Sequence, residues 1–207
     1  MVFSMNLPNL LTLSRIPLML LVIGLIYPSP SEGWPWIRTI ALAVFLFTAL
    51  TDWLDGWLAR KFGQVSEFGK FMDALSDKVL TLGMLTSLLA LGAVPKWTLF
   101  PILLILSREL LITGLRLVAA GKGKTLAAEK IGKFKTFIQL TCISLVLSKL
   151  AVEVDFENVI EAKIHAEIVS YLELSSLFTL SFASLVTVFS GFTYMKKYWR
   201  FFLDDEK

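Results

Sequence analysis

The segment that decides the fold runs from residue 52 to residue 77 and reads DWLDGWLARKFGQVSEFGKFMDALSD. It carries two pairs of aspartates. Asp52 and Asp55 are three residues apart, and Asp73 and Asp77 are four apart. Side chains three or four residues apart lie on one face of an α-helix. The segment therefore predicts two helices, each with a pair of carboxylates on one side.

A short loop, residues 61–68, joins the two predicted helices, so we expect them to be antiparallel neighbours with their carboxylates at similar depth. Four carboxylates brought together repel one another, and burying a carboxylate in lipid is costly. A divalent cation removes both costs. With no histidine or cysteine nearby, the oxygen ligands indicate Mg²⁺ or Mn²⁺, and such sites usually serve phosphate chemistry. The alternative is a surface charge pattern without a metal. That interpretation suits two exposed aspartates at a helix end, but it suits four aspartates on the paired faces of two helices less well.

The composition places these helices in a membrane. Apolar residues make up 56% of the 207 residues and charged residues only 18%, and the mean hydropathy is +0.70. A soluble domain of this size normally carries more charge. We read the formal net charge of +3 as loop charge beside a membrane and expect no nucleic-acid partner.

The apolar runs predict an all-α, polytopic membrane protein with six transmembrane helices in a single domain, residues 1–207. A helix needs about 20 apolar residues to cross the hydrocarbon core. An interfacial segment of about residues 1–15 precedes the spans, and the first run reaches spanning length only if residues 9–15 continue its helix. The expected spans are residues 16–28, 37–59, 71–91, 98–118, 134–152 and 172–195.

Lysine and arginine set the expected orientation. With the N-terminus inside, the inner segments hold most of the basic residues and the last outer loop is acidic. Cytoplasmic loops carry the excess of lysine and arginine, so both termini and the aspartates are expected on the cytoplasmic side. Residues 159–170 in that outer loop form either a short amphipathic helix or a plain loop, and His165, on that side, is taken as a surface residue.

The aspartate segment resembles the signature of the CDP-alcohol phosphotransferase family, whose pattern is D-x2-D-G-x2-A-R-x8-G-x3-D-x3-D. Every fixed position of the pattern is filled here, by Asp52, Asp55, Gly56, Ala59, Arg60, Gly69, Asp73 and Asp77. The resemblance implies a six-helix membrane fold that covers most of the chain, an active site open to the cytoplasm, and a homodimer.

The resemblance also implies roles for these residues. The four aspartates would hold a pair of Mg²⁺ or Mn²⁺ ions on the pyrophosphate of a CDP-activated lipid, and Asp77 would be the general base that deprotonates the acceptor alcohol. The lining of the CDP site would comprise Asp52, Asp55, Gly56, Ala59 and Gly69. Many relatives have proline after the third aspartate, where this chain has Ala74.

Three further stretches resemble the bacterial phosphatidylglycerophosphate synthase branch of the family: residues 6–15, 107–116 and 130–136. The substrates there are CDP-diacylglycerol and glycerol 3-phosphate, and the enzyme lies in the inner membrane of a bacterium among membrane lipids. An anionic acceptor needs cationic partners. The candidates for the acceptor phosphate are Arg60, Arg108, Arg116, Lys133 and Lys135.

These candidates lie at different depths. Arg108 and Arg116 are eight residues apart, so they share a helix face about 12 Å long. Arg116 lies near the inner surface, whereas Arg108 is nearly mid-membrane and needs a partner, either Glu109 or a carboxylate in a polar cavity. Arg116 and Lys135 are the better phosphate ligands. The alternative for Lys133 and Lys135 is a basic loop that touches anionic lipid.

Other functions stay open. The same transfer to inositol phosphate, phosphatidylglycerol or serine uses the same metal site, and inositol phosphate also requires cationic partners. A transporter is the alternative of a different class, because intramembrane carboxylates also mark ion pathways. Transporters often contain repeats and helices broken at the midplane, whereas these aspartates cluster at one end of the spans.

Overall fold

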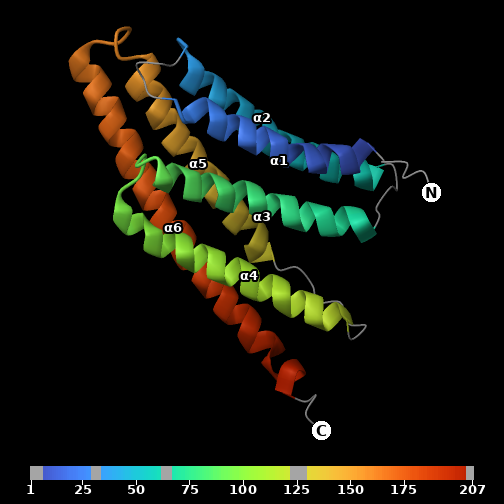
Figure 1. Ribbon diagram of the computed structural model, residues 1–207. Helices are drawn as coiled ribbons and strands as arrows, with labels where there is room; N and C mark the ends of the chain where they lie inside the picture. Colours follow the sequence, from blue (N-terminus) through green and yellow to red (C-terminus); the bar gives the residue numbers. More distant parts are fainter. Residues whose placement is uncertain (1–6, 29–33, 62–66, 122–129, 204–207) are drawn as a thin grey trace.

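The computed structural model describes residues 7–28, 34–61, 67–121 and 130–203, and the side chains of residues 14–28, 34–51, 75–121 and 134–199 (Figure 1). Within these ranges the chain is all-helical, as its apolar runs predict. The helices are α1 (Leu7–Ile26), α2 (Ile37–Lys61), α3 (Glu67–Ala90), α4 (Leu99–Gly121), α5 (Lys130–Asp155) and α6 (Ala162–Leu203), with a short 3-10 turn η1 (Lys96–Thr98) before α4.

Helix α5 lies at the centre of the bundle, where it packs against α2, α3 and α6 (Figure 1). Helix α1 packs against α2 and α3, and α4 packs against α6 and α3. The described parts of α2 and α3 are thus linked through two helices, α1 and α5, that contact both. The core residues between them are almost all aliphatic, and three that are fully buried, Val22, Phe45 and Ile143, come from three different helices.

Helix α3 ends where a glycine reverses the chain. Gly92 has a φ of +70°, a backbone conformation that costs glycine little. The backbone N–H of Gly92 bonds the carbonyl of Leu89, and that of Ala93 bonds the carbonyl of Leu88. These two bonds are those of a Schellman motif, which satisfies the last carbonyls of a helix and leads the chain directly into η1 and α4.

The N-terminal end of α2 is capped by a residue of another helix. The Asp155 carboxylate at the end of α5 accepts hydrogen bonds of 2.7 Å from both the backbone N–H and the hydroxyl of Thr39. The neighbouring Arg38 donates to the carbonyls of Leu25 and Pro28 at the end of α1. Free N–H groups at a helix start and free carbonyls at a helix end are thus satisfied across three helices.

Removal of this cap is expected to destabilise the bundle. We expect Asp155→Ala to lower the free energy of unfolding by about 1–2 kcal/mol, the cost of losing a helix N-cap. Denaturant unfolding of the purified protein in detergent measures it. The matched control is Glu157→Ala, an exposed position two residues away. An equal loss in both variants would contradict a role of Asp155 as the cap.

Helix α6 is continuous over 42 residues. The sequence left a short amphipathic helix or a plain loop open for residues 159–170. Residues 159–161 precede the helix, and residues 162–170 form the first turns of α6. By length and composition, two helical stretches among the described residues can cross a bilayer, Phe134–Asp155 in α5 and Ala162–Trp199 in α6, and the apolar stretches Ser14–Ile26 and Ile37–Thr51 are shorter.

Candidate active site

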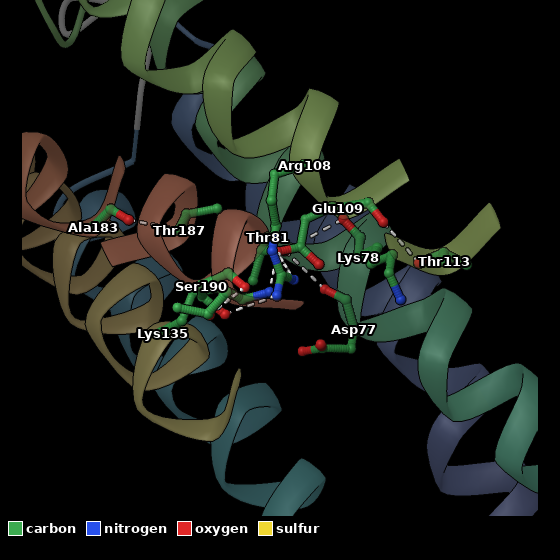
Figure 2. A network of polar contacts seen from close by, with 11 residues as sticks. Asp77, Lys78, Thr81, Arg108, Glu109, Thr113, Lys135, Ala183, Thr187 and Ser190 are labelled. Carbon is green, nitrogen blue, oxygen red and sulfur yellow. Dashed lines mark hydrogen bonds and ion pairs between the residues drawn. The ribbon is translucent and has the colours of Figure 1, made fainter. Parts of the chain in front are cut away.

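Side chains of α3, α4, α5 and α6 converge on one polar cluster inside the bundle (Figure 2). Asp77 comes from α3, Arg108 and Glu109 from α4, Lys135 from α5 and Ser190 from α6. The cluster is possible because α6 presents small polar residues such as Thr187 and Ser190, both fully buried, to its neighbours. Small residues allow helices to approach closely in a membrane.

The centre of the cluster is a buried ion pair between Lys135 and Glu109. Only 5% of Lys135 and 7% of Glu109 are exposed. The ammonium group of Lys135 donates to Oε1 of Glu109, and the guanidinium of Arg108 lies 3.5 Å from the same oxygen. Of the two partners expected for Arg108, Glu109 or a carboxylate in a polar cavity, Glu109 is one that the structure provides.

Helix α6 holds Arg108 in place from the other side. Arg108 donates a hydrogen bond of 2.9 Å to the hydroxyl of Ser190, and a Cβ added at Gly191 would lie 2.8 Å from Cγ of Arg108. Real Cβ atoms do not approach another atom this closely, so the arginine would have to move. The glycine next to Ser190 thus makes room for the guanidinium stem.

Asp77 belongs to the same cluster. The negative charge of Asp77 attracts the ammonium group of Lys135, whereas the positive charge of Arg108 repels that ammonium group. The backbone of Asp77 is fixed independently, because the hydroxyl of Thr81 donates to its carbonyl at 2.9 Å. The structure therefore brings together three of the predicted site residues: Asp77, Arg108 and Lys135 (Figure 2).

Arg116 occupies a different environment, two turns further along α4. Its guanidinium lies 5.4 Å from the ring centre of Tyr194, and its Nε is 3.4 Å from the Tyr194 hydroxyl. A cation over an aromatic face is a stable arrangement without any ligand. Arg116 is exposed, unlike Arg108 and Lys135.

The remaining predicted residues lie outside the part of the chain whose side chains are described. They are Asp52, Asp55, Gly56, Ala59, Arg60, Gly69, Asp73, Ala74 and Lys133. Within the described side chains no group of three or more acidic, histidine or cysteine residues could hold a metal ion. Three of the four predicted metal ligands lie outside those ranges, and the fourth, Asp77, offers the carboxylate oxygens that Mg²⁺ prefers.

Arg15 was missed by the sequence reasoning, which placed it in the interfacial segment. It lies within α1, is fully buried, and donates to the hydroxyl of Ser76 on α3 at 3.5 Å. Ser76, also fully buried, directly precedes Asp77. A buried arginine is rare unless it is paired, so Arg15 ties α1 to the turn of α3 that carries Asp77. Its place within residues 6–15, a stretch resembling one family branch, was the available signal.

Three relatives are similar in sequence to this chain over most of their length. The chain is 35% identical over 202 residues to the CDP-diacylglycerol–glycerol-3-phosphate 3-phosphatidyltransferase of Bacillus subtilis (strain 168), covering 94% of this chain and 95% of the relative. It is 32% identical to the protein of the same name from Rickettsia bellii (strain RML369-C), covering 95% and 97%.

A third relative is the probable phosphatidylglycerophosphate synthase of Mycobacterium tuberculosis (strain CDC 1551 / Oshkosh), 33% identical over 93% of this chain and 81% of the relative. The model of the CDP-alcohol phosphatidyltransferase family matches residues 5–179. This is a membrane-associated family that generally uses divalent metal ions. The aspartate motif, the helical bundle and these matches agree, and the chain belongs to the CDP-alcohol phosphatidyltransferase family.

Proposed function

We propose that this protein transfers the phosphatidyl group from CDP-diacylglycerol to glycerol 3-phosphate, giving phosphatidylglycerophosphate and CMP. The names of its relatives support this transfer. The structural observation that carries it is a pair of cations beside Asp77: Lys135, which is buried, and Arg108, whose side chain is 11% exposed. Cations inside a membrane bundle mark a binding site for an anion, and glycerol 3-phosphate is an anion that also carries an attacking hydroxyl.

The proposed mechanism assigns one task to each group. Arg108 and Lys135 bind the phosphate of the acceptor, which directs its free hydroxyl toward Asp77. The Asp77 carboxylate takes the hydroxyl proton, the oxygen attacks the lipid-bearing phosphorus, and the bond to CMP breaks. Proton transfer in the transition state typically contributes about 10²- to 10⁴-fold to the rate. The binding of both ends of the acceptor supplies orientation.

Divalent ions, held by Asp52, Asp55, Asp73 and Asp77, would neutralise the charge that builds up on the pyrophosphate. Gly56, Ala59 and Gly69 would leave room beside them for the CDP group, and Arg60 and Lys133 would add positive charge. Arg116, which is exposed, would add further positive charge for the acceptor phosphate. We place the active site on the cytoplasmic face of a bacterial inner membrane, with both termini on that side and with six spans in each subunit of a homodimer.

The decisive experiment measures CMP release by the purified protein with CDP-diacylglycerol, Mg²⁺ and one acceptor at a time. We expect release with glycerol 3-phosphate and none with inositol phosphate, phosphatidylglycerol or serine. Turnover with one of those alcohols instead would overturn the acceptor while keeping the transfer. No CMP release with any alcohol would contradict the proposed enzymatic function and favour a transporter.

A further inference from the structure

The acidic residue at the centre of the cluster, Glu109, has no role in the mechanism above. It is buried, and one of its oxygens contacts two cations, Arg108 of the same helix α4 and Lys135 of α5. Arg108 repels the ammonium group of Lys135, and like charges in a low-dielectric interior repel strongly. Without a carboxylate between them the two cations would separate. Glu109 therefore keeps them side by side.

We propose that Glu109 is a positioning residue for the acceptor phosphate, which holds Lys135 and Arg108 close enough to bind the same phosphate together. This inference rests on the proposed function, because it requires a phosphorylated acceptor. An ammonium group has three donors and a guanidinium has five. Both cations can therefore contact Glu109 and still offer N–H groups to a ligand.

The charges favour the same reading. Arg108 and Lys135 carry two positive charges and Glu109 one negative charge, so these three side chains have a net charge of +1. Asp77 also attracts Lys135, but in the mechanism its carboxylate receives a proton and shares the metal ions. When Asp77 is engaged in this way, its carboxylate offsets less of the charge of Lys135. An acceptor phosphate brings negative charge to the same two cations, and opposite charges attract strongly in a low-dielectric interior.

The direct test compares Glu109→Gln with the wild type. The amide keeps the size of the side chain but removes the charge that offsets the repulsion between the two cations. We expect the KM for glycerol 3-phosphate to rise about tenfold or more, the scale of a hydrogen bond to a charged group, while the KM for CDP-diacylglycerol changes less than about twofold. Glu109→Asp keeps the charge and is expected to rescue the KM in part.

The matched control is Glu173→Gln, which removes the acidic partner of another lysine of α5. Lys149 and Glu173 form an ion pair of 3.1 Å between α5 and α6, four turns along α5 from Lys135. We expect both KM values to stay unchanged in this variant. Glu109→Gln can also destabilise the bundle. The protection of the protein against thermal unfolding by glycerol 3-phosphate is therefore measured in parallel, without CDP-diacylglycerol. The protection is expected to be lost in Glu109→Gln and kept in Glu173→Gln.

A second variant disturbs the cluster without changing any charge. Gly191→Ala places a methyl group against Arg108, and we expect it also to raise the KM for glycerol 3-phosphate selectively. Its control is Gly114→Ala on α4, where an added Cβ meets no atom within 4 Å. An unchanged or lower KM for glycerol 3-phosphate in Glu109→Gln would overturn the inference even if stability fell. A wild type that uses only an uncharged alcohol would overturn the proposed function and the inference together.

Discussion

We expect Asp77→Asn to reduce CMP release by about 10³- to 10⁴-fold, the upper part of the range for losing a general base. The amide is nearly the same size as the carboxylate but cannot accept the hydroxyl proton and is a weaker metal ligand. The backbone of α3 is expected to stay in place, since Thr81 bonds the carbonyl of residue 77 and not its side chain. The loss should therefore appear in kcat with the protein still folded.

The assay uses the purified protein with saturating CDP-diacylglycerol, glycerol 3-phosphate and Mg²⁺. The control is Asp155→Asn, the same chemical change at the C-terminal end of α5. The amide oxygen there can still accept a hydrogen bond from Thr39. We expect this control to keep its activity. If Asp77→Asn retained more than about a tenth of wild-type activity, a base that contributes at least 10²-fold would have to lie elsewhere.

Replacement of Lys135 by methionine is expected to have the second largest effect, and to act on both binding and stability. The apolar chain still fills the space between α4 and α5, but the phosphate loses a charged donor. We expect the KM for glycerol 3-phosphate to rise about 10- to 100-fold. Glu109 also loses its closest partner and keeps only the longer contact with Arg108, so we expect the free energy of unfolding to fall by no more than about 3 kcal/mol, the lower end of the cost of breaking a buried ion pair.

The double variant Glu109→Gln/Lys135→Met separates these two effects. It removes both charges, so we expect most of the stability to return while the KM for glycerol 3-phosphate stays high. Lys149→Met is the control for stability. Its partner Glu173 is 43% exposed in its side chain, and exposed pairs contribute less than about 1 kcal/mol. Recovery of the KM together with stability in the double variant would show that Lys135 only balances Glu109.

The helices were predictable because membrane spans need long apolar runs, and the runs that begin near residues 37, 98 and 134 each correspond to a helix. The aspartate motif could also be recognised in the sequence, because its residues are near each other and their spacing determines which helix face they share. The pairing of Arg108 with Glu109 could be anticipated because the two are adjacent and an arginine at mid-membrane depth needs a partner.

The contacts between distant helices could not be predicted. The partners of Arg108 on α6, Ser190 and Gly191, are about 80 residues away in the sequence, and nothing in the composition of α6 marks that turn. Arg15 was expected in the interfacial segment that precedes the first span, yet the bundle buries it beside Ser76. Arg116 was expected near the inner surface as a better phosphate ligand than Arg108, but its contact with the ring of Tyr194 could not be predicted.

The single cysteine has a practical consequence for locating the protein in its membrane. Cys142 is the one cysteine in the sequence, it is 1% exposed, and its thiol donates to the carbonyl of Ser176 at 3.5 Å. A thiol without solvent contact reacts slowly with bulky maleimides. The native chain therefore gives little background labelling in cysteine-scanning experiments. A cysteine introduced at exposed Lys163 or Lys196 and labelled with a membrane-impermeant reagent would show which end of α6 faces the cell interior.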